Sequence, residues 1–372
     1  MSPYLCPQAK EWLTLMFMPG LGPVRINRLV DHFHSPRAIL HAADDVLAQT
    51  GLRTCAIRSI SDERSGKQSE AKAVRELERI QALGVSLVSR QCSRYPPLLK
   101  EIADPPPILY YKGMLPAITC PVIAIVGSRA ATEYGKRTAS NLAGQLTQSG
   151  IAVVSGGAYG VDTAAHRGVL NKNGLTIAVF GCGIDVVYPK PNRQLFTEIE
   201  RSGAVVSEYP LGTKPEGFRF PERNRIISGL AAGIIVVEAS LRSGALITAR
   251  LALDQGRDLF AVPGRIDSPK SYGCHRLIQQ GALLVQSVED VLETLSLKKA
   301  REKTEKDPLA EDSWFSDSEQ KVLSTLDAYP VDIDTISRVS GIAASEIHGV
   351  LLQLELKGRI RQVAGQQYEK IQ

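Results

Sequence analysis

Phosphate-binding chemistry is indicated where glycines follow a short apolar run and precede a helical stretch. The stretch "AIVGSRAATEYGKR" places Gly127, Ser128 and Arg129 directly after such a run, with a helix expected from about Ala131. Unpaired amides at a helix N-terminus carry partial positive charge, and an adjacent arginine adds a bidentate donor for phosphate. We therefore predict that this turn binds an anion.

Two further stretches repeat this order of residues. "SGGAYGVDTAAH", residues 155–166, and "FGCGIDVVYPKPNRQL" each follow another apolar run. Their candidate contacts are Ser155, Gly156, Gly157, Lys190, Asn192 and Arg193. A single glycine loop is a common way to start a helix, whereas three such loops in one sheet indicate an extended, phosphate-rich ligand.

Cations and aromatic rings alternate in "GFRFPERNRIISGL", which we expect to lie just before a helix. The candidate contacts in this stretch are Arg223, Asn224 and Arg225, beside Arg219 and two phenylalanines. Arginines among aromatic rings suit a single-stranded nucleic acid, whose phosphates and bases are both accessible. The alternative is a surface loop in which these arginines pair with Glu216 and Glu222.

One more turn of this kind occurs in "EASLRSGALITARLALDQGR", where Ser243 and Gly244 precede a helix. A lone turn of this type is usually only a helix cap. Beside the other loops, we include both residues as candidate contacts.

Acid–base chemistry is the main alternative to simple binding, because Asp162, Glu208 and Glu238 lie at strand ends or helix starts. We prefer the interpretation that Asp162 caps its helix and that the two glutamates pair with neighbouring arginines. The first loop has no GxGxxG, and the chain has no GxxxxGK[ST]. The sequence therefore predicts no catalytic residue, cofactor or metal.

A nucleotide hydrolase resembling the phosphoribohydrolases of the lysine-decarboxylase-like kind remains the alternative function, since those enzymes use a related sheet. They carry a GGxGT turn followed by a glutamate. The stretch "SGALITARLALD" has neither the second glycine nor that acid.

The elements that must position these loops are short apolar runs separated by helix-length amphipathic stretches. The expected strands are residues 122–126, 152–155, 176–180, 204–208, 233–239, 258–264 and 282–285. Such alternation predicts a parallel α/β sheet, and runs this apolar are buried on both faces. We predict an extended Rossmann-like, doubly wound sheet with its ligand beyond the carboxyl ends of the strands.

A helical module is expected before this sheet, over residues 1–92, with the sheet domain over residues 93–295. Its start, "EWLTLMFMPGLGPVRINRLVDHF", resembles a helix-hairpin-helix or SAM-like unit, whose glycine-turn amides can meet a nucleic-acid phosphate. The alternative is a hairpin that uses Gly20 and Gly22 only to turn the chain. A second, weaker copy is "DDVLAQTGLRTCAIRSI".

A charged linker over residues 296–313 and a winged helix over residues 314–372 are expected at the other end. The third helix of that winged helix, about residues 344–357, carries Glu346, His348 and Glu355 and almost no cations. Duplex reading needs cations on this helix, so a protein-interaction or packing role is favoured.

Composition narrows the class of protein. The chain has 372 residues, 44% hydrophobic content and a net charge of +5, which permits an acidic partner without requiring one. Six cysteines without a CxxC pair predict reduced packing residues rather than a zinc site or disulfides. No signal peptide or membrane span is recognisable, so we expect a cytoplasmic protein with no membrane partner.

The motifs together resemble one family. They are "YPPLLKEIADPPPILYYKG", "IVGSR…YG", "SGGAYGVDTAAH", "VFGCGIDVVYPKPN", "SEYPLG", "FPERNRIISGL", "VVEASLRSGALITA" and "FAVPGRIDSPKSYGCHRLIQQGA". In this order, over roughly residues 95–292, they are similar to the DNA-processing protein A family (DprA/Smf). The helical module and the winged helix resemble those of its longer members.

This resemblance implies a non-enzymatic mediator of natural transformation and DNA recombination. Such proteins bind incoming single-stranded DNA, form homodimers, load a RecA-type recombinase and help displace single-strand-binding protein. By this resemblance, Arg129 and Lys190 are the main phosphate contacts. Backbone amides come from Gly127, Ser128, Ser155, Gly156 and Gly157, and the same groove is lined by Arg223, Asn224 and Arg225.

Two departures from the family pattern stand out. Gly157 and Tyr159 occupy "SGxAxG" positions that usually hold an apolar and often a charged residue, so a stacking ring replaces a charge. His275 stands where asparagine is common, in a position that also suits an ordinary loop residue.

Overall fold

The computed structural model describes residues 4–52, 54–115, 119–295, 315–326, 330–363 and 367–370. The chain divides into two compact units, residues 1–301 and 302–372. The predicted linker, residues 296–313, lies outside the described residues.

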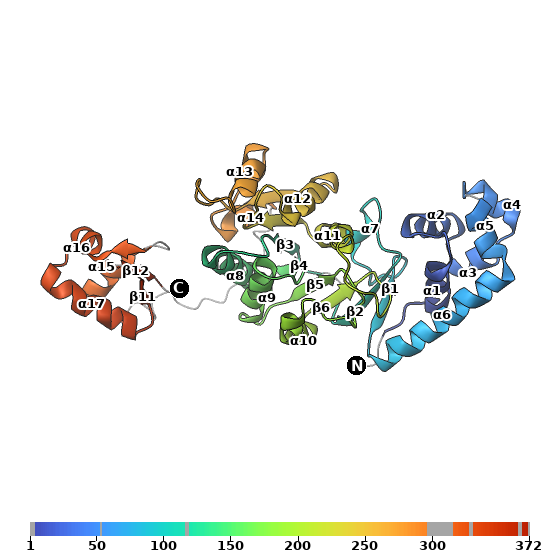
Figure 1. The fold of residues 1–372 in the computed structure, drawn as a ribbon, viewed down its shortest axis with the longest axis horizontal. Coiled ribbons are helices and arrows are strands. Elements are labelled where there is room, and N and C mark those ends of the chain that lie inside the picture. Colours follow the sequence, from blue (N-terminus) through green and yellow to red (C-terminus); the bar gives the residue numbers. More distant parts are fainter. Residues whose placement is uncertain are drawn as a thin grey trace. The chain divides into compact units, whose positions relative to one another are not determined.

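A nine-stranded sheet forms the centre of the first unit, in the order β1-β2-β6-β5-β4-β3-β7-β8-β9 (Figure 1). The strands are β1 Ser86–Ser89, β2 Ile108–Gly113, β3 Val122–Val126, β4 Ala152–Ser155, β5 Thr176–Phe180, β6 Ala204–Ser207, β7 Gly233–Val236, β8 Asp258–Ala261 and β9 Leu283–Leu284. All neighbours from β6 to β9 are parallel, while β2 pairs antiparallel with β6 and β1.

The strand order reverses at β3. The chain builds outward from β3 through β4, β5 and β6, then returns to the other side of β3 for β7, β8 and β9. The β3–β7 pair is therefore the topological switch point, where open α/β sheets bind their ligands. The predicted doubly wound, Rossmann-like fold is confirmed.

All seven predicted runs contain a strand, but four of them end earlier than expected, including β9, which stops at Leu284 and not at residue 285. The strands β6, β7 and β8 stop at Ser207, Val236 and Ala261, and the following residues belong to loops. The sequence analysis did not predict β1 and β2. These two strands join the sheet by antiparallel pairing and not through strand–helix–strand units, so the alternation of apolar runs and helices does not reveal them.

Helices cover both faces of the sheet (Figure 1). On one face lie α8 Glu133–Gln148, α9 Val161–Leu170, α10 Arg193–Ser202 and α14 Val288–Thr294; on the other lie α7 Pro97–Lys100, α11 Arg219–Leu230, α12 Gly244–Asp254 and α13 Tyr272–Gln279. Because side chains alternate along a strand, Ile123 and Ile125 pack on the first face and Ala124 on the second.

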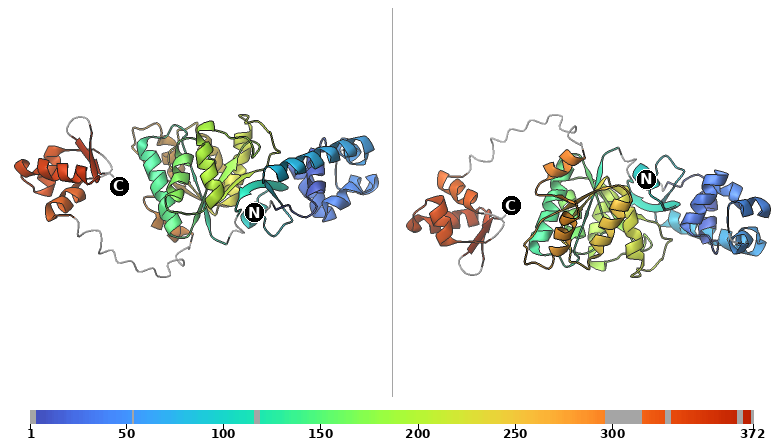
Figure 2. Two further views of the ribbon diagram at one scale, coloured as in Figure 1. Left: turned by 90° about the horizontal axis from the view of Figure 1, so that it is seen from below. Right: turned by 90° about the horizontal axis from the view of Figure 1, so that it is seen from above.

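Six N-terminal helices precede the sheet (blue in Figure 2). They are α1 Ala9–Phe17, α2 Pro23–Phe33, α3 Pro36–Leu40, α4 Asp44–Gln49, α5 Thr54–Ser61 and α6 Glu63–Ala82. Their buried side chains, including Trp12 and Leu29, belong to the same hydrophobic core as Leu87 of β1 and Tyr110 of β2. The helices and the edge of the sheet thus share one continuous interior.

The turn of the first hairpin contains Gly20, with a φ of +79°, and Gly22, which directly precedes α2. Arg25 donates to the carbonyl of Gly20 at 2.5 Å, so one cation of the hairpin stabilises the turn itself.

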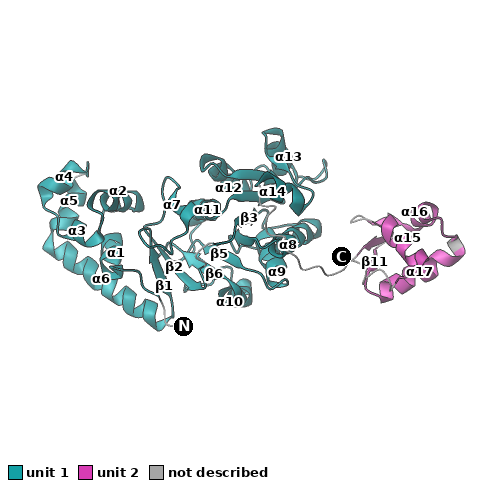
Figure 3. Cartoon of the chain, turned by 180° about the vertical axis from the view of Figure 1, so that it is seen from behind, with its two compact units in different colours: residues 1–301 teal, residues 302–372 magenta. Residues whose placement is uncertain are grey.

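The second unit is a winged helix, as predicted (Figure 3). It contains α15 Asp317–Thr325, β10 Val331–Asp332, α16 Ile333–Ser340, α17 Ala344–Leu356, β11 Ile360–Val363 and β12 Gln367–Lys370. The strands form a sheet in the order β10-β12-β11. Val322, Ile336 and Leu354 are among the buried residues of its core.

The cysteines were expected to be reduced packing residues. Cys6, Cys182 and Cys274 are buried packing residues, but Cys55 is exposed, so the packing prediction is wrong for that residue.

Among the described residues, no helix has both the length and the apolar character that crossing a bilayer requires.

Candidate functional site

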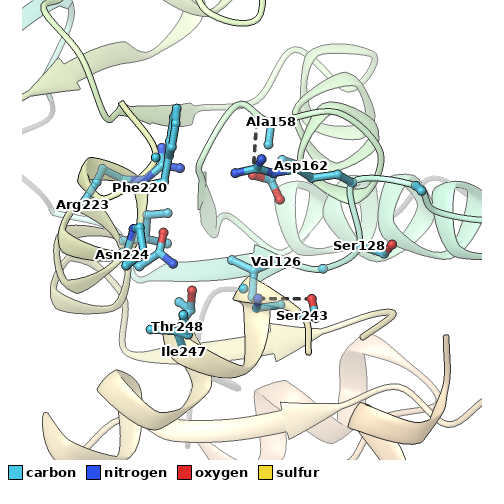
Figure 4. Close-up of a pocket in the computed structure, with 18 of the residues that line it drawn as sticks. Val126, Ser128, Ala158, Asp162, Phe220, Arg223, Asn224, Ser243, Ile247 and Thr248 are labelled. Atoms are coloured by element: carbon cyan, nitrogen blue, oxygen red, sulfur yellow. Dashed lines mark hydrogen bonds between the residues drawn. The ribbon is translucent and has the colours of Figure 1, made fainter. Parts of the chain in front are cut away.

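A cleft of 640 Å³ opens beyond the carboxyl ends of β3 and β7, at the switch point of the sheet (Figure 4). Seven of the predicted contacts line it: Gly127, Ser128, Arg129, Arg223, Asn224, Ser243 and Gly244. The first three follow β3, the next two lie on α11, and the last two form the start of α12. Loops and helix starts far apart in the sequence thus converge on one hollow.

Arg129 is the exposed cation of this cleft. Its guanidinium carbon lies 5.3 Å from the centre of the Phe220 ring, within the range of a cation–π contact. Such a contact restrains the long side chain while leaving its N–H donors available to an anion. Arg129 therefore offers a positive charge and a neighbouring ring at one place.

Lys190 is also exposed, at the start of the short 3₁₀ helix Lys190–Asn192. Asn192, the third residue of that helix, is buried, and its side-chain amide donates to the carbonyl of Gly157 at 3.0 Å and to Thr163 Oγ1 at 2.9 Å. This amide ties the third glycine loop to the second. The structure thus uses Asn192 to hold the Lys190 loop in place.

The N-terminus of α8 is occupied by a side chain of the protein. The helix begins at Glu133, not near Ala131, and Thr132 is its N-cap. The backbone N–H of Thr132 donates to Oε2 of Glu238 at 2.9 Å, and its hydroxyl donates to Oε1. Glu238, expected to pair with an arginine, instead accepts these two hydrogen bonds. The buried carboxylate of Glu238 therefore already balances the partial positive charge at this helix N-terminus.

Buried side chains support the second glycine loop. Ser155 is fully buried and donates to the carbonyl of Ile125 at 2.7 Å. Asp162 accepts from the backbone N–H of Ala158 at 3.2 Å, a residue that precedes α9. The N-cap of α9 is Gly160 and no side chain caps it, so the expectation that Asp162 caps its helix is wrong. Burial raises the pKa of Asp162, and the nearby Arg223 opposes that rise. The backbone of this loop therefore lies over a buried carboxyl with an arginine nearby.

Glycine is required at the centre of that loop. A Cβ on Gly156 would lie 2.6 Å from a guanidinium nitrogen of Arg223, and Gly157 has a φ of +66°. The loop can approach Arg223 this closely only without a side chain.

Arg223 and its neighbours lie within α11, which starts at Arg219, so the expectation that they precede a helix is wrong. Arg223 is 4% exposed and donates to the carbonyls of Gly156, at 2.8 Å, and Val179. Burial lowers its pKa to about 10. Arg223 lines the cleft, but its Nη1 donates to the backbone of the second glycine loop and of β5.

Arg225 does not line the cleft in this structure. Its guanidinium pairs with Glu208 at 2.6 Å and with Asp104 at 2.8 Å, so the expected pairing of Glu208 with an arginine is confirmed. Arg219 pairs with Glu216 at 3.0 Å, as the ion-pair alternative predicts. Glu222 instead accepts from the hydroxyl of Tyr209 at 3.2 Å.

The N-terminus of α12 faces open space. Ser243 caps the helix by accepting from the backbone N–H of Ala245 at 3.3 Å. No atom lies within 4 Å of a Cβ built on Gly244, and both residues line the cleft. Ser243 and Leu246 also donate their backbone N–H groups within this turn, which leaves the exposed Gly244 N–H as the group accessible to a phosphate.

Aromatic rings form a second, adjoining pocket, of which Tyr159 and a phenylalanine of "GFRFPERN" were noted from the sequence and Tyr188 was not. It is lined by Tyr159, Tyr188, Phe220 and Gly156, and it shares Arg129 with the main cleft. The side chains of Tyr159 and Tyr188 are 46% and 43% exposed. Tyr188 lies two residues before Lys190 in the "YPK" turn. The sequence signal that could have predicted this pocket was the presence of two aromatic residues beside candidate phosphate contacts.

His275 lies in α13, where its Nε2 is 2.9 Å from the carbonyl oxygen of Gly264. This contact closes the loop after β8, so His275 has a structural role there.

The fold and the cleft define a class: a parallel α/β protein whose switch-point cleft combines an exposed arginine, an open helix N-terminus and aromatic rings. The chain matches the family model described as DNA recombination-mediator protein A over residues 86–296, and that of the DprA winged helix domain over residues 303–366. It belongs to the DNA recombination-mediator protein A (DprA/Smf) family, as the sequence motifs indicated.

Relatives over the full length support this assignment. Protein Smf of Escherichia coli K12 is 37% identical, with 95% of this chain and 94% of that protein aligned. Protein Smf of a Synechocystis strain is 35% identical, with 96% and 98% aligned.

Two solved structures are similar to this one. The X-ray structure of DNA processing protein A from Streptococcus pneumoniae has a TM-score of 0.68 and 38% identity, covering 77% of this chain and 97% of that one. DNA processing protein A from Helicobacter pylori has a TM-score of 0.51 and 32% identity, covering 57% and 95%. The latter structure is described as giving insight into a unique single-stranded DNA binding mode.

Proposed function

We propose that this protein is a recombination mediator that holds single-stranded DNA in the switch-point cleft and passes it to a RecA-type recombinase. The observation that carries the proposal is Arg129, an exposed cation held 5.3 Å from the Phe220 ring at the mouth of the cleft. The open start of α12 lies in the same cleft, and Lys190 on a neighbouring loop adds an exposed charge. These groups bind a phosphate backbone.

Single strands fit this site better than duplex DNA. Tyr159 and Tyr188 present half-exposed rings beside the cations, and unpaired bases can stack on such rings whereas duplex bases cannot. The Helicobacter pylori relative, described as binding single-stranded DNA, supports this choice. Because phosphates carry the contacts, binding is independent of base sequence.

Acid–base catalysis by the candidate carboxylates has less support. Glu238 is bonded to Thr132, Asp162 accepts from Ala158 and lies near Arg223, and Glu208 pairs with Arg225. Each is committed to the protein and has low exposure. We therefore favour a binding protein over the phosphoribohydrolase-like alternative.

We also propose that the protein forms a homodimer. This homodimer engages a RecA-type recombinase and helps displace single-strand-binding protein. The edge strand β9 offers a surface for a second copy, since Leu283 and Leu284 are 43% and 44% exposed. Two clefts on one strand raise its affinity through effective concentration. Oligonucleotides long enough to bridge both protomers will therefore bind more tightly than short ones.

Fluorescence anisotropy with labelled single-stranded and duplex DNA tests the proposal. Arg129→Ala and Lys190→Ala will each weaken single-strand binding about tenfold, the effect of removing one charge-assisted hydrogen bond. The slope of log affinity against log salt will become shallower by about 0.7 for each phosphate that no longer meets a cation. The matched controls are Arg201→Ala, in the last turn of α10, and Lys172→Ala, just after α9, which each remove an exposed cation.

Several outcomes contradict the proposal. Unchanged single-strand binding in both cleft variants places the DNA elsewhere. Equal losses in the control variants show that net charge alone drives the interaction. No binding by the wild-type protein returns the phosphoribohydrolase-like function to consideration, which hydrolysis of nucleoside monophosphates would then test.

A further inference from the structure

The last half of α6 contacts two loops of the α/β domain. Glu76 is 5% exposed, and its Oε1 accepts from the backbone N–H of Leu211 at 2.7 Å. Its Oε2 lies 3.5 Å from Nη1 of Arg79, one turn further along the helix. A buried carboxylate of the helical module thus anchors the loop that follows β6.

Arg79 bridges that loop to a second one. Its Nη1 donates to the carbonyl of Leu211 at 3.3 Å, and its Nη2 donates to Oδ2 of Asp185 at 3.2 Å. Asp185 lies in the loop after β5, and its Oδ1 accepts from the backbone N–H of Gly212 at 2.7 Å. Glu76, Arg79 and Asp185, here called the α6 clamp, therefore join both loops to one helix and to each other.

Both loops lead directly to the candidate DNA site. Five residues after Asp185 the first loop reaches Lys190, and it carries Tyr188 of the aromatic pocket on the way. The second loop supplies Pro215 and Gly217 to the lining of the cleft before α11 begins. The α6 clamp holds the near end of each segment, while Asn192 holds the far end of the first.

We propose that Arg79 and Glu76 are positioning residues for single-stranded DNA binding: they fix the Lys190 loop and the loop before α11 from outside the cleft. This inference rests on the proposed function. The side chain of Arg79 is 49% exposed, whereas those of its partners Glu76 and Asp185 are only 6% and 18% exposed. The free energy of unfolding of each Arg79 variant is therefore measured beside its affinity, so that an effect on the loops is separated from an effect on folding.

Hydrogen exchange tests the clamp without DNA. In Arg79→Met, exchange will be faster at residues 183–186 and 211–213, while exchange in β3 and β4 is unchanged. The matched control is Arg90→Met. It removes another arginine bridge between the helices and the sheet domain, from Arg90 Nη1 to Asp31 Oδ1 at 2.8 Å, which touches neither loop. Equal exchange in Arg79→Met and wild type overturns the proposal.

Anisotropy then tests the link to DNA. Arg79→Met will weaken single-strand binding about fivefold, with Arg79→Lys recovering part of the loss because it keeps the charge near Asp185. In a Lys190→Ala background the same change will have a smaller effect, because the residue that the clamp positions is gone. In an Arg129→Ala background it will keep its full effect, because Arg129 lies on a loop that the clamp does not contact.

The two proposals fail in different ways. Normal wild-type binding with unchanged affinity in Arg79→Met overturns the positioning role alone. Full additivity with Lys190→Ala also overturns it, since it shows that Arg79 acts through another part of the protein. A wild-type chain that does not bind single strands overturns the proposed function, and the positioning role with it.

Discussion

The floor and the rim of the cleft are built from the same motifs but have opposite properties. On the floor, Arg223 and Asp162 are buried, and Nη1 of Arg223 and Oδ2 of Asp162 are hydrogen-bonded to neighbouring backbone. Arg129 of the cleft, Tyr159 of the adjoining aromatic pocket and Lys190 of the neighbouring loop, which we call the rim, are exposed. A cation in one of these motifs is therefore a candidate DNA contact only where its side chain is exposed. The floor should govern stability, and the rim should govern affinity.

The largest expected effect is on the floor. Arg223→Met leaves Asp162 without its neighbouring cation and the carbonyls of Gly156 and Val179 without a donor, because Arg223 is 4% exposed and supplies all three interactions. Leaving buried polar groups without these partners costs about 1–3 kcal/mol for each group. Urea denaturation should show that loss in the free energy of unfolding.

The rim provides the control for this change. Arg129→Ala should alter the free energy of unfolding by no more than about 0.5 kcal/mol, as expected for an exposed side chain. A loss below about 1 kcal/mol in Arg223→Met would break the comparison, since an unpaired buried charge costs more than that.

A buried histidine outside the cleft lining extends the comparison to pH. His166 is fully buried, with Nδ1 2.7 Å from Thr176 Oγ1 and no hydrogen-bond partner for Nε2 among the described residues. Burial, with a smaller contribution from Arg223, lowers its pKa from 6.5 to about 3. Below pH 6.5 the unfolded chain therefore binds a proton that the folded chain does not.

The sign of the effect follows from that difference. The contribution of His166 to stability is complete above pH 6.5 and falls as the pH drops toward 3, by about 1.4 kcal/mol per pH unit. In His166→Gln this part of the slope disappears, although the variant is less stable at every pH. Urea denaturation between pH 7 and pH 5 measures both slopes, and equal slopes would contradict the assignment.

The smallest expected effect is on the rim. Tyr159→Leu should weaken binding of single-stranded DNA about fivefold, near the lower end of what one base–ring stack contributes. Tyr159→Phe keeps the ring and should bind like the wild type. The thermal midpoint of unfolding should not move in either variant, because the side chain is 46% exposed. Loss of affinity in Tyr159→Phe would point to the hydroxyl and not to stacking.

Much of the fold was predictable because parallel strands that are buried on both faces are continuous apolar runs. The cleft followed from glycine loops at the ends of those runs, since parallel strands bring their carboxyl ends to one edge. The partners of individual side chains were not predictable. Arg225 pairs with Asp104, and Glu238 bonds to Thr132, more than a hundred residues away in sequence. No local pattern reports such pairs, and they decide which charges remain accessible.

The shared interior of the N-terminal helices and the sheet has a consequence for the modularity of the chain. The recombination-mediator match begins at residue 86, yet Leu87 and Tyr110 lie in one hydrophobic core with Trp12 and Leu29. A boundary of homology is therefore not a boundary of folding. A fragment that starts there would expose one wall of that core to water, so recombining this sheet with another family member's helices requires matched apolar surfaces on both.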